Sequence, residues 1–260
     1  MTYLGDIISG NGSNKKNVTS RIEKGHGKIN DILNILEKTS LGYHYFRIAL
    51  LLRESRFLNS ILTNAYIWFG LSKSEIEQFE QLDLVLLRKF IKTPFSVPEE
   101  AVYLELGCLN IETIIKARRI VYLQYLVKQE ESSMLNNFFM AQWKYPAKRN
   151  EWTEQVQCDL NDFGLSVDLD ILRKISINSF KTQVKKKAKQ YAFYTFLEKK
   201  ESHSKIENLF FTELKLQNYL NLENMNKIEA QTIFSYRTRM SNFGENYRGA
   251  IYLPPLQKSP

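Results

Sequence analysis

The chain has 260 residues and a formal net charge of +8, and its composition is 43% hydrophobic and 25% charged. This balance is typical of globular proteins and argues against wholesale disorder. Every apolar run is shorter than the roughly 18 residues that a membrane helix needs. Polar residues interrupt the apolar stretch at the N-terminus, so this stretch does not resemble a signal peptide. With only two cysteines, Cys108 and Cys158, neither a disulfide framework nor a metal cluster is expected. These features predict an intracellular protein of the nucleus or cytoplasm, not a secreted one.

Most of the chain shows the spacing of apolar residues that is typical of helices. Only residues 3–9 look extended, and they end at a Gly-Asn-Gly-Ser turn, residues 10–13. From there apolar residues recur at three- and four-residue steps, which predicts helices within 22–36, 45–69, 72–90, 98–106, 111–128, 152–163, 171–195 and 228–240. Helix ends are expected at Gly42, Gly70, Gly107, Gly164 and Gly244. The predicted fold class is mainly α: an irregular multi-helix bundle with a short N-terminal extended segment and no large sheet.

A polar stretch at residues 129–133 divides two apolar regions of the chain. We therefore expect a thumb-like helical region over residues 1–130 and a C-terminal helical region, with a basic helix, over residues 131–250. The Pro-rich end, residues 251–260, is expected to form a disordered tail.

The excess positive charge is concentrated in residues 173–205, which contain ten basic and only two acidic residues. We expect this segment to form one long helix whose buried stripe consists of Ile177, Phe180, Val184, Ala188, Tyr191 and Thr195. Lys181, Lys185 and Lys189 follow at i, i+4 spacing and form a second row beside that stripe. Lysines neutralise phosphates and exposed aromatic rings stack on bases, so the interleaved Phe180, Tyr191, Phe193, Tyr194 and Phe196 favour a nucleic-acid partner. An amphipathic helix with solvated lysines and core aromatics fits the charge pattern equally well.

Asp168 and Asp170 form the most suggestive carboxylate pair in the sequence. Two acids at i, i+2 can bind a divalent ion, but a cap for the helix that begins near Ile171 is the favoured interpretation. The three histidines are far apart, and neither a phosphate-binding glycine loop nor a metal-ligand motif occurs. The sequence therefore predicts no catalytic residue, no metal site and no cofactor.

Several short motifs follow one another in a fixed order along the chain. They are Tyr3-Leu4-Gly5; Arg53-Glu54-Ser55 leading to residues 61–68; Tyr103-Leu104-Glu105-Leu106-Gly107; Arg118-Arg119 with Tyr122-Leu123; and Tyr236-Arg237-Thr238-Arg239-Met240 before Asn242-Phe243 and Asn246-Tyr247. In this order they resemble the reverse transcriptases of non-LTR, LINE-like retrotransposons, in the part that follows the catalytic palm. The order is far more specific than any one motif.

The resemblance implies a helical thumb and a C-terminal region that grips template RNA or primer DNA. The family is an RNA-directed DNA polymerase whose Y/F-x-D-D turn, with its metal-binding aspartates, lies before the segment that opens with Tyr3. Neither this turn nor the family's Cys/His knuckle occurs between Tyr3 and Pro260. Because polymerase chemistry needs two metal ions held by carboxylates, we expect this chain alone to be a non-catalytic, nucleic-acid-binding fragment of a transposable element.

The expected partner is RNA or DNA, bound through its phosphate backbone, with no membrane partner and no small-molecule cofactor. The expected nucleic-acid-binding residues are Lys181, Lys185, Lys186, Lys187, Lys189, Arg118, Arg119, Arg237 and Arg239. For the four arginines, surface exposure or pairing with carboxylates is the competing explanation. Three alternatives remain: a helical protein-interaction module without a nucleic-acid partner, an enzyme that uses the Asp168/Asp170 pair, and a chain that aggregates because its helices lack a palm to cover them.

Overall fold

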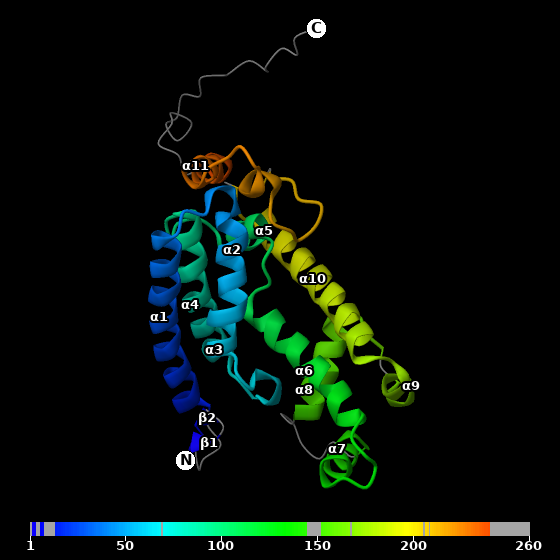
Figure 1. Ribbon diagram of the computed structural model, residues 1–260. Coiled ribbons are helices and arrows are strands. Elements are labelled where there is room, and N and C mark those ends of the chain that lie inside the picture. The colour runs from blue at the N-terminus through cyan, green and yellow to red at the C-terminus, as the bar shows by residue number, and fades with distance from the viewer. Residues whose placement is uncertain are drawn as a thin grey trace.

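The computed structural model describes residues 2–3, 6–7, 14–68, 70–144, 152–166, 168–204, 206–207 and 209–239. Within these ranges the regular structure is almost entirely helical (Figure 1). Two short strands, β1 (Thr2–Tyr3) and β2 (Asp6–Ile7), pair antiparallel near the N-terminus. The predicted fold class, a mainly α multi-helix bundle with a short extended start and no large sheet, is confirmed.

The helices follow one another with short connections. The first part of the chain forms α1 (Lys15–Lys38), η1 (Gly42–His44), α2 (Tyr45–Leu52), η2 (Arg53–Leu58), α3 (Asn59–Ile61), η3 (Ala65–Ile67), α4 (Lys73–Ile91) and α5 (Glu99–Leu106). The second part forms α6 (Ile111–Val127), α7 (Met134–Lys144), α8 (Trp152–Asp162), α9 (Leu169–Lys174), α10 (Ile177–Glu201), η4 (Asn218–Asn221) and α11 (Lys227–Arg237). None of the helices in the described ranges is long and apolar enough to cross a membrane.

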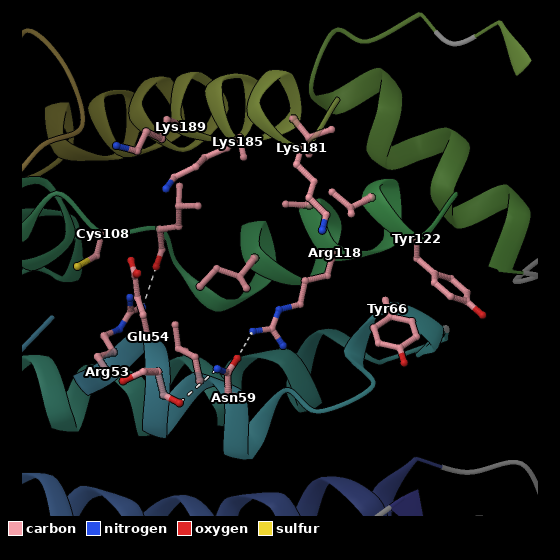
Figure 2. Close-up of a pocket in the computed structure, with 18 of the residues that line it drawn as sticks. Arg53, Glu54, Asn59, Tyr66, Cys108, Arg118, Tyr122, Lys181, Lys185 and Lys189 are labelled. Carbon is pink, nitrogen blue, oxygen red and sulfur yellow. Dashed lines mark hydrogen bonds between the residues drawn. The ribbon is translucent and has the colours of Figure 1, made fainter. Parts of the chain in front are cut away.

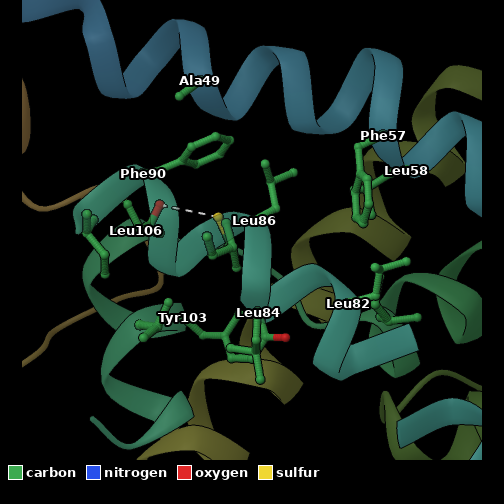
Figure 3. Close-up of a cluster of buried hydrophobic side chains, with 14 of the residues drawn as sticks. Ala49, Phe57, Leu58, Leu82, Leu84, Leu86, Phe90, Tyr103 and Leu106 are labelled. Carbon is green, nitrogen blue, oxygen red and sulfur yellow. Dashed lines mark hydrogen bonds between the residues drawn. The ribbon is translucent and has the colours of Figure 1, made fainter. Parts of the chain in front are cut away.

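One hydrophobic cluster lies where α1, α2, η2, α4 and α5 meet (Figure 3). Phe57, Leu86 and Phe90 are fully buried at its centre. Gly25 lets α1 approach α4 closely, because a Cβ atom at this position would lie 2.4 Å from Cδ2 of Leu82. The apolar faces of these helices therefore form one continuous core.

A second hydrophobic cluster joins the C-terminal part of α6 to α7, α8, α9 and the N-terminal half of α10. The other half of α10 and the whole of α11 pack on the first cluster, through Phe196 and Phe234. The two clusters thus meet within α6 and α10. The expected two-region organisation stays a prediction, and its tail, residues 251–260, lies outside the described residues.

Two helix caps form between residues that are close in sequence, and one of them confirms a prediction. Ser72 and Glu75 form a reciprocal capping box at the start of α4. Oδ1 of Asp168 accepts hydrogen bonds from the backbone N–H groups of Asp170 and Ile171, at 2.8 and 3.3 Å, and caps α9. Both caps are local in sequence, and the residue pattern predicted the one at Asp168.

The basic segment is not one long helix, contrary to expectation. It breaks between α9 and α10, where the hydroxyl of Ser176 accepts a hydrogen bond from the N–H of Ser179 and starts a new helix. Ile177 was expected in the buried stripe but is 47% exposed, because it lies in the first turn of α10, beyond the core. Phe180, Val184 and Ala188 are buried as predicted, whereas Tyr191 and Thr195 are only half-buried.

The glycines expected at helix ends differ in role. Gly107 ends α5 with a φ of +65°, and Gly164 follows α8 with a φ of +58°. Gly42 does not end α1, which stops at Lys38; it begins η1 instead. Gly244 and the turn at residues 10–13 lie outside the described residues.

Candidate nucleic-acid groove

A groove of about 1080 Å³ lies between α10 and the α2–α3 segment. We call it the central groove (Figure 2). Apolar side chains of α6 and α10 form part of its lining, namely Ile114, Ala117, Val121, Val184 and Ala188. Charged side chains of the same two helices and of η2 also line it, so a bound molecule would meet both apolar and charged surface.

Lys181, Lys185 and Lys189 form one wall of the central groove, and we call them the lysine row. All three are exposed, and the helical rise places successive members about 6 Å apart along α10. In Figure 2, Lys181 and Lys185 extend from α10 toward the opposite wall. Among the residues that line the groove, Glu54 is the single acid. The electrostatic potential in the groove therefore favours an anion.

Arg118 reaches the same groove from α6. Its Nη1 donates to the carbonyl of Leu62 at 2.6 Å, and its Nη2 donates to Oδ1 of Asn59 at 3.2 Å. Burial lowers the pKa of Arg118, but a guanidinium remains charged throughout the pH range of proteins. The positive charge of Arg118 is therefore fixed in place opposite the lysine row.

The wall opposite α10 is a π-helix, η2, a rare conformation that is frequent at functional sites. Arg53 opens it and donates from Nε and Nη2 to the two carboxylate oxygens of Asp83, at 2.6 and 2.5 Å. A third hydrogen bond, 2.9 Å long, runs from Nη2 to the carbonyl of Leu109. Burial alone lowers the pKa of Arg53, yet the Asp83 carboxylate raises it overall. This ion pair joins η2, α4 and the α5–α6 loop.

Three tyrosines pack together at the Lys181 end of the central groove. Tyr122 and Tyr125 stack, with ring centroids 5.4 Å apart and an interplanar angle of 18°, while Tyr66 lies 4.5 Å from Tyr122 with its ring tilted by 39°. Tyr125 is the outermost ring and is 49% exposed. We call these rings the tyrosine stack. Sequence reasoning missed it, although Arg118, Tyr122 and Tyr125 follow at i, i+4, i+7 and so share one face of α6.

The other residues expected to bind nucleic acid lie away from the central groove. Lys186 is exposed and Lys187 half-buried near Gly164, and neither lines the groove. Arg119 is buried and forms a bidentate pair with Asp159, at 2.7 and 2.9 Å. Such pairing with a carboxylate was the competing explanation for this arginine.

Arg237 and Arg239 also lie elsewhere, at the end of α11. Nε of Arg237 donates to Oε1 of the fully buried Glu105 at 2.7 Å, and its guanidinium lies 5.5 Å from the ring of Tyr219. Arg239 is exposed beyond the helix, with a φ of +53°. The structure therefore brings together Arg118 and the lysine row, and it does not add these two arginines to them.

The aromatic residues of the basic segment do not share a surface with the lysine row. Phe180 and Phe196 are buried, and Tyr191 packs on Phe163 with ring centroids 5.4 Å apart. Phe193 is half-buried, while Tyr194 is 68% exposed but does not line the groove. The aromatic rings of the groove come from η3 and α6 instead.

Of the two carboxylates that could bind a divalent ion, Asp168 has a structural role. Among the residues that the structure describes, no cluster of His, Cys, Asp or Glu could hold a metal ion. Asp168 caps α9, as described above. Burial raises the pKa of the Cys108 thiol, at the edge of the groove, to about 12, so this thiol is protonated at neutral pH.

Glu80 holds the start of α6, one of the helices that line the groove, through contacts that the sequence did not indicate. Its carboxylate accepts hydrogen bonds from the Tyr103 hydroxyl at 2.8 Å and from Nδ2 of Asn110 at 3.0 Å. It also accepts from the backbone N–H groups of Ile111 and Glu112, at 3.1 and 2.9 Å, and so caps α6 from another helix. No local pattern shows a cap whose partner lies on a different helix.

Stability should depend on pH through Glu80. Burial raises the pKa of Glu80 to about 7, against the opposing effect of its hydrogen-bond donors. The folded state therefore binds a proton more tightly than the unfolded state, and the free energy of unfolding falls by about 3 kcal/mol as pH rises from about 4.5 to 7. Glu80→Gln should lack this component in urea unfolding at about pH 5 and about pH 8. Glu77→Gln, on the exposed side of α4, is the control; an identical pH dependence in Glu80→Gln and the parent would contradict the assignment.

Most motifs of the reverse-transcriptase resemblance meet at the central groove. Glu54 and Ser55 line it from η2, Gly107 from the end of α5, and Arg118 and Tyr122 from α6. These residues are distant in sequence, and the fold brings them to one surface. The motif that opens with Tyr236 lies on α11, away from the groove, and its last residues are outside the described ranges.

No protein-family model, curated protein or solved structure matches this chain. The resemblance to LINE-like reverse transcriptases therefore rests on the quoted motifs alone. What supports a function is the chemistry of the central groove itself.

Proposed function

We propose that this protein binds nucleic acid in the central groove, chiefly through phosphate contacts, and that it is a non-catalytic relative of the C-terminal part of LINE-like reverse transcriptases. The observation that carries the proposal is the lysine row, which faces one groove together with Arg118. Lysine and arginine side chains neutralise phosphates and release condensed counterions, which supplies most of the affinity for a polyanion.

The placement of the lysines favours this function over a merely solvated helix face. The lysine row borders a concave surface in which Glu54 is the single acid among the lining residues. Lys200, on the same helix, is buried instead and donates to the carbonyls of Ile206 and Glu207. Lysines with a structural role are thus separate from those that border the groove.

The triple variant Lys181→Ala/Lys185→Ala/Lys189→Ala should bind RNA at least about tenfold more weakly than the parent chain at low salt. In a plot of log affinity against log salt concentration, the slope should become shallower by about 2, because about 0.7 is lost for each phosphate contact with a single strand. Fluorescence anisotropy with a labelled oligonucleotide, between about 50 and about 200 mM salt, measures both quantities.

The matched control is Lys174→Ala/Lys186→Ala/Lys199→Ala, which removes the same three charges from exposed positions outside the groove. This control should keep most of the affinity and the salt slope. Equal losses in the two triple variants would mean that net charge, not the groove, governs binding. Undiminished binding by the folded groove variant would refute the proposed site.

A protein-interaction module is the second candidate, and one observation favours it. On α7, Met134, Leu135 and Phe138 are 73%, 42% and 61% exposed, an apolar face of the kind that partner proteins cover. This candidate predicts that the parent chain shows no measurable affinity for RNA or DNA near physiological salt. The same anisotropy titration therefore distinguishes the two functions.

A further inference from the structure

We infer that the central groove selects single-stranded nucleic acid over a duplex, with unpaired bases stacked on Tyr125 at the end of the tyrosine stack. This inference rests on the proposed function, because it names the kind of nucleic acid that the same groove takes. Its basis is the combination of the tyrosine stack and the lysine row in one groove.

Its packing holds the tyrosine stack in place and leaves the ring of Tyr125 exposed. Tyr122 is held between Tyr66 and Tyr125, and Trp152 packs edge-on against it with centroids 5.8 Å apart. The indole Nε1 of Trp152 donates to the carbonyl of Tyr66 at 2.7 Å, which fixes the far side of the stack. Tyr125, at the outer end, stays 49% exposed. A planar ligand can therefore extend the stack without rearranging it.

Stacking on tyrosine requires a free base face. In a duplex each base is paired and covered by its neighbours, whereas the bases of a single strand can turn out and stack on aromatic side chains. Phosphate contacts alone do not require exposed aromatic rings in the groove. The tyrosine stack thus adds a contact that only unpaired bases can make.

The tyrosine stack and the lysine row follow one another along the groove. Figure 2 shows Tyr122 and Tyr66 beyond Lys181 and Arg118, and Lys189 at the other end, near Cys108. A strand laid along the groove would place a base on the tyrosine stack and its following phosphates beside Lys181 and Lys185. Because every base has a π face, this arrangement selects strandedness and not base sequence.

The test compares three labelled probes in anisotropy titrations of the whole chain. They are a single strand of about 10 nucleotides, its duplex, and a fully abasic strand of the same length. The single strand should bind at least about tenfold more tightly than the other two, because stacking of one base contributes about that factor. Tyr125→Leu should remove this advantage, while Tyr125→Phe, which keeps the ring, should retain it.

Tyr194→Leu, at an exposed tyrosine outside the groove, is the matched control and should leave all three affinities unchanged. Equal affinity for single strand and duplex, with no effect of Tyr125→Leu, would overturn the inference and leave the proposed function standing. Absence of binding to all three probes at low salt would overturn both.

Discussion

Asp83→Asn should lower the free energy of unfolding by about 3–5 kcal/mol, because it leaves the charge of Arg53 buried without its carboxylate. Arg53 is 2% exposed and Asp83 is 0% exposed, so water cannot replace the lost partner. Single domains are stable by only about 5–15 kcal/mol, so the variant should unfold at much lower urea concentrations. Far-UV circular dichroism during a urea titration measures the change.

A double variant distinguishes the lost charge pair from a packing defect. Arg53→Met/Asp83→Leu removes both charges and keeps apolar bulk, so it should be more stable than Asp83→Asn alone. Asp31→Asn provides the surface control, since the Lys28–Asp31 pair at 2.9 Å is 44% and 54% exposed and should change stability by less than about 1 kcal/mol. If Asp83→Asn costs no more than Asp31→Asn, the buried pair does not form.

The fold was largely predictable because its signals are local. Ser72 and Asp168 cap the helices that follow them, and apolar spacing located most helices to within a few residues. The break at Ser176 was missed because basic residues lie on both sides of it, and the predicted apolar stripe begins only after it, at Ile177. A serine in such a segment can lie inside one long helix or cap the start of a second helix. The packing of α9 on α6 favours the second arrangement.

The site was only partly predictable, since its parts come from separate elements. The i, i+4 spacing of Lys181, Lys185 and Lys189 showed that they share a helix face, but not that this face borders a groove. The tyrosine stack needs η3 beside α6, a contact between residues more than fifty positions apart. Arg119 and Asp159 are likewise distant in sequence, so their pairing could not be distinguished from a free basic patch.

Gly107→Ala should be as damaging as the loss of the buried ion pair, for reasons of backbone geometry. Gly107 has a φ of +65°, which costs about 1–2 kcal/mol for any residue with a Cβ atom. That Cβ would lie 2.1 Å from the carbonyl carbon of Lys215 and 2.2 Å from the backbone N of Leu216. Backbone atoms cannot rotate away as a side chain does, so we expect a total loss of roughly 3–5 kcal/mol in the free energy of unfolding.

Two other glycines distinguish the cost of a positive φ from the cost of the backbone contact. Gly42 also has a positive φ, +51°, but a Cβ there would meet nothing within 4 Å, so Gly42→Ala should show the conformational cost alone, about 1–2 kcal/mol. Gly27 lies inside α1 with the same open space, and Gly27→Ala should raise stability by up to about 1 kcal/mol. Urea unfolding of the three variants should therefore give two losses of different size and one gain. If Gly107→Ala loses no more than Gly42→Ala, the segment at 215–216 does not pack on the end of α5, and the C-terminal elements would have to be joined to the core by other contacts.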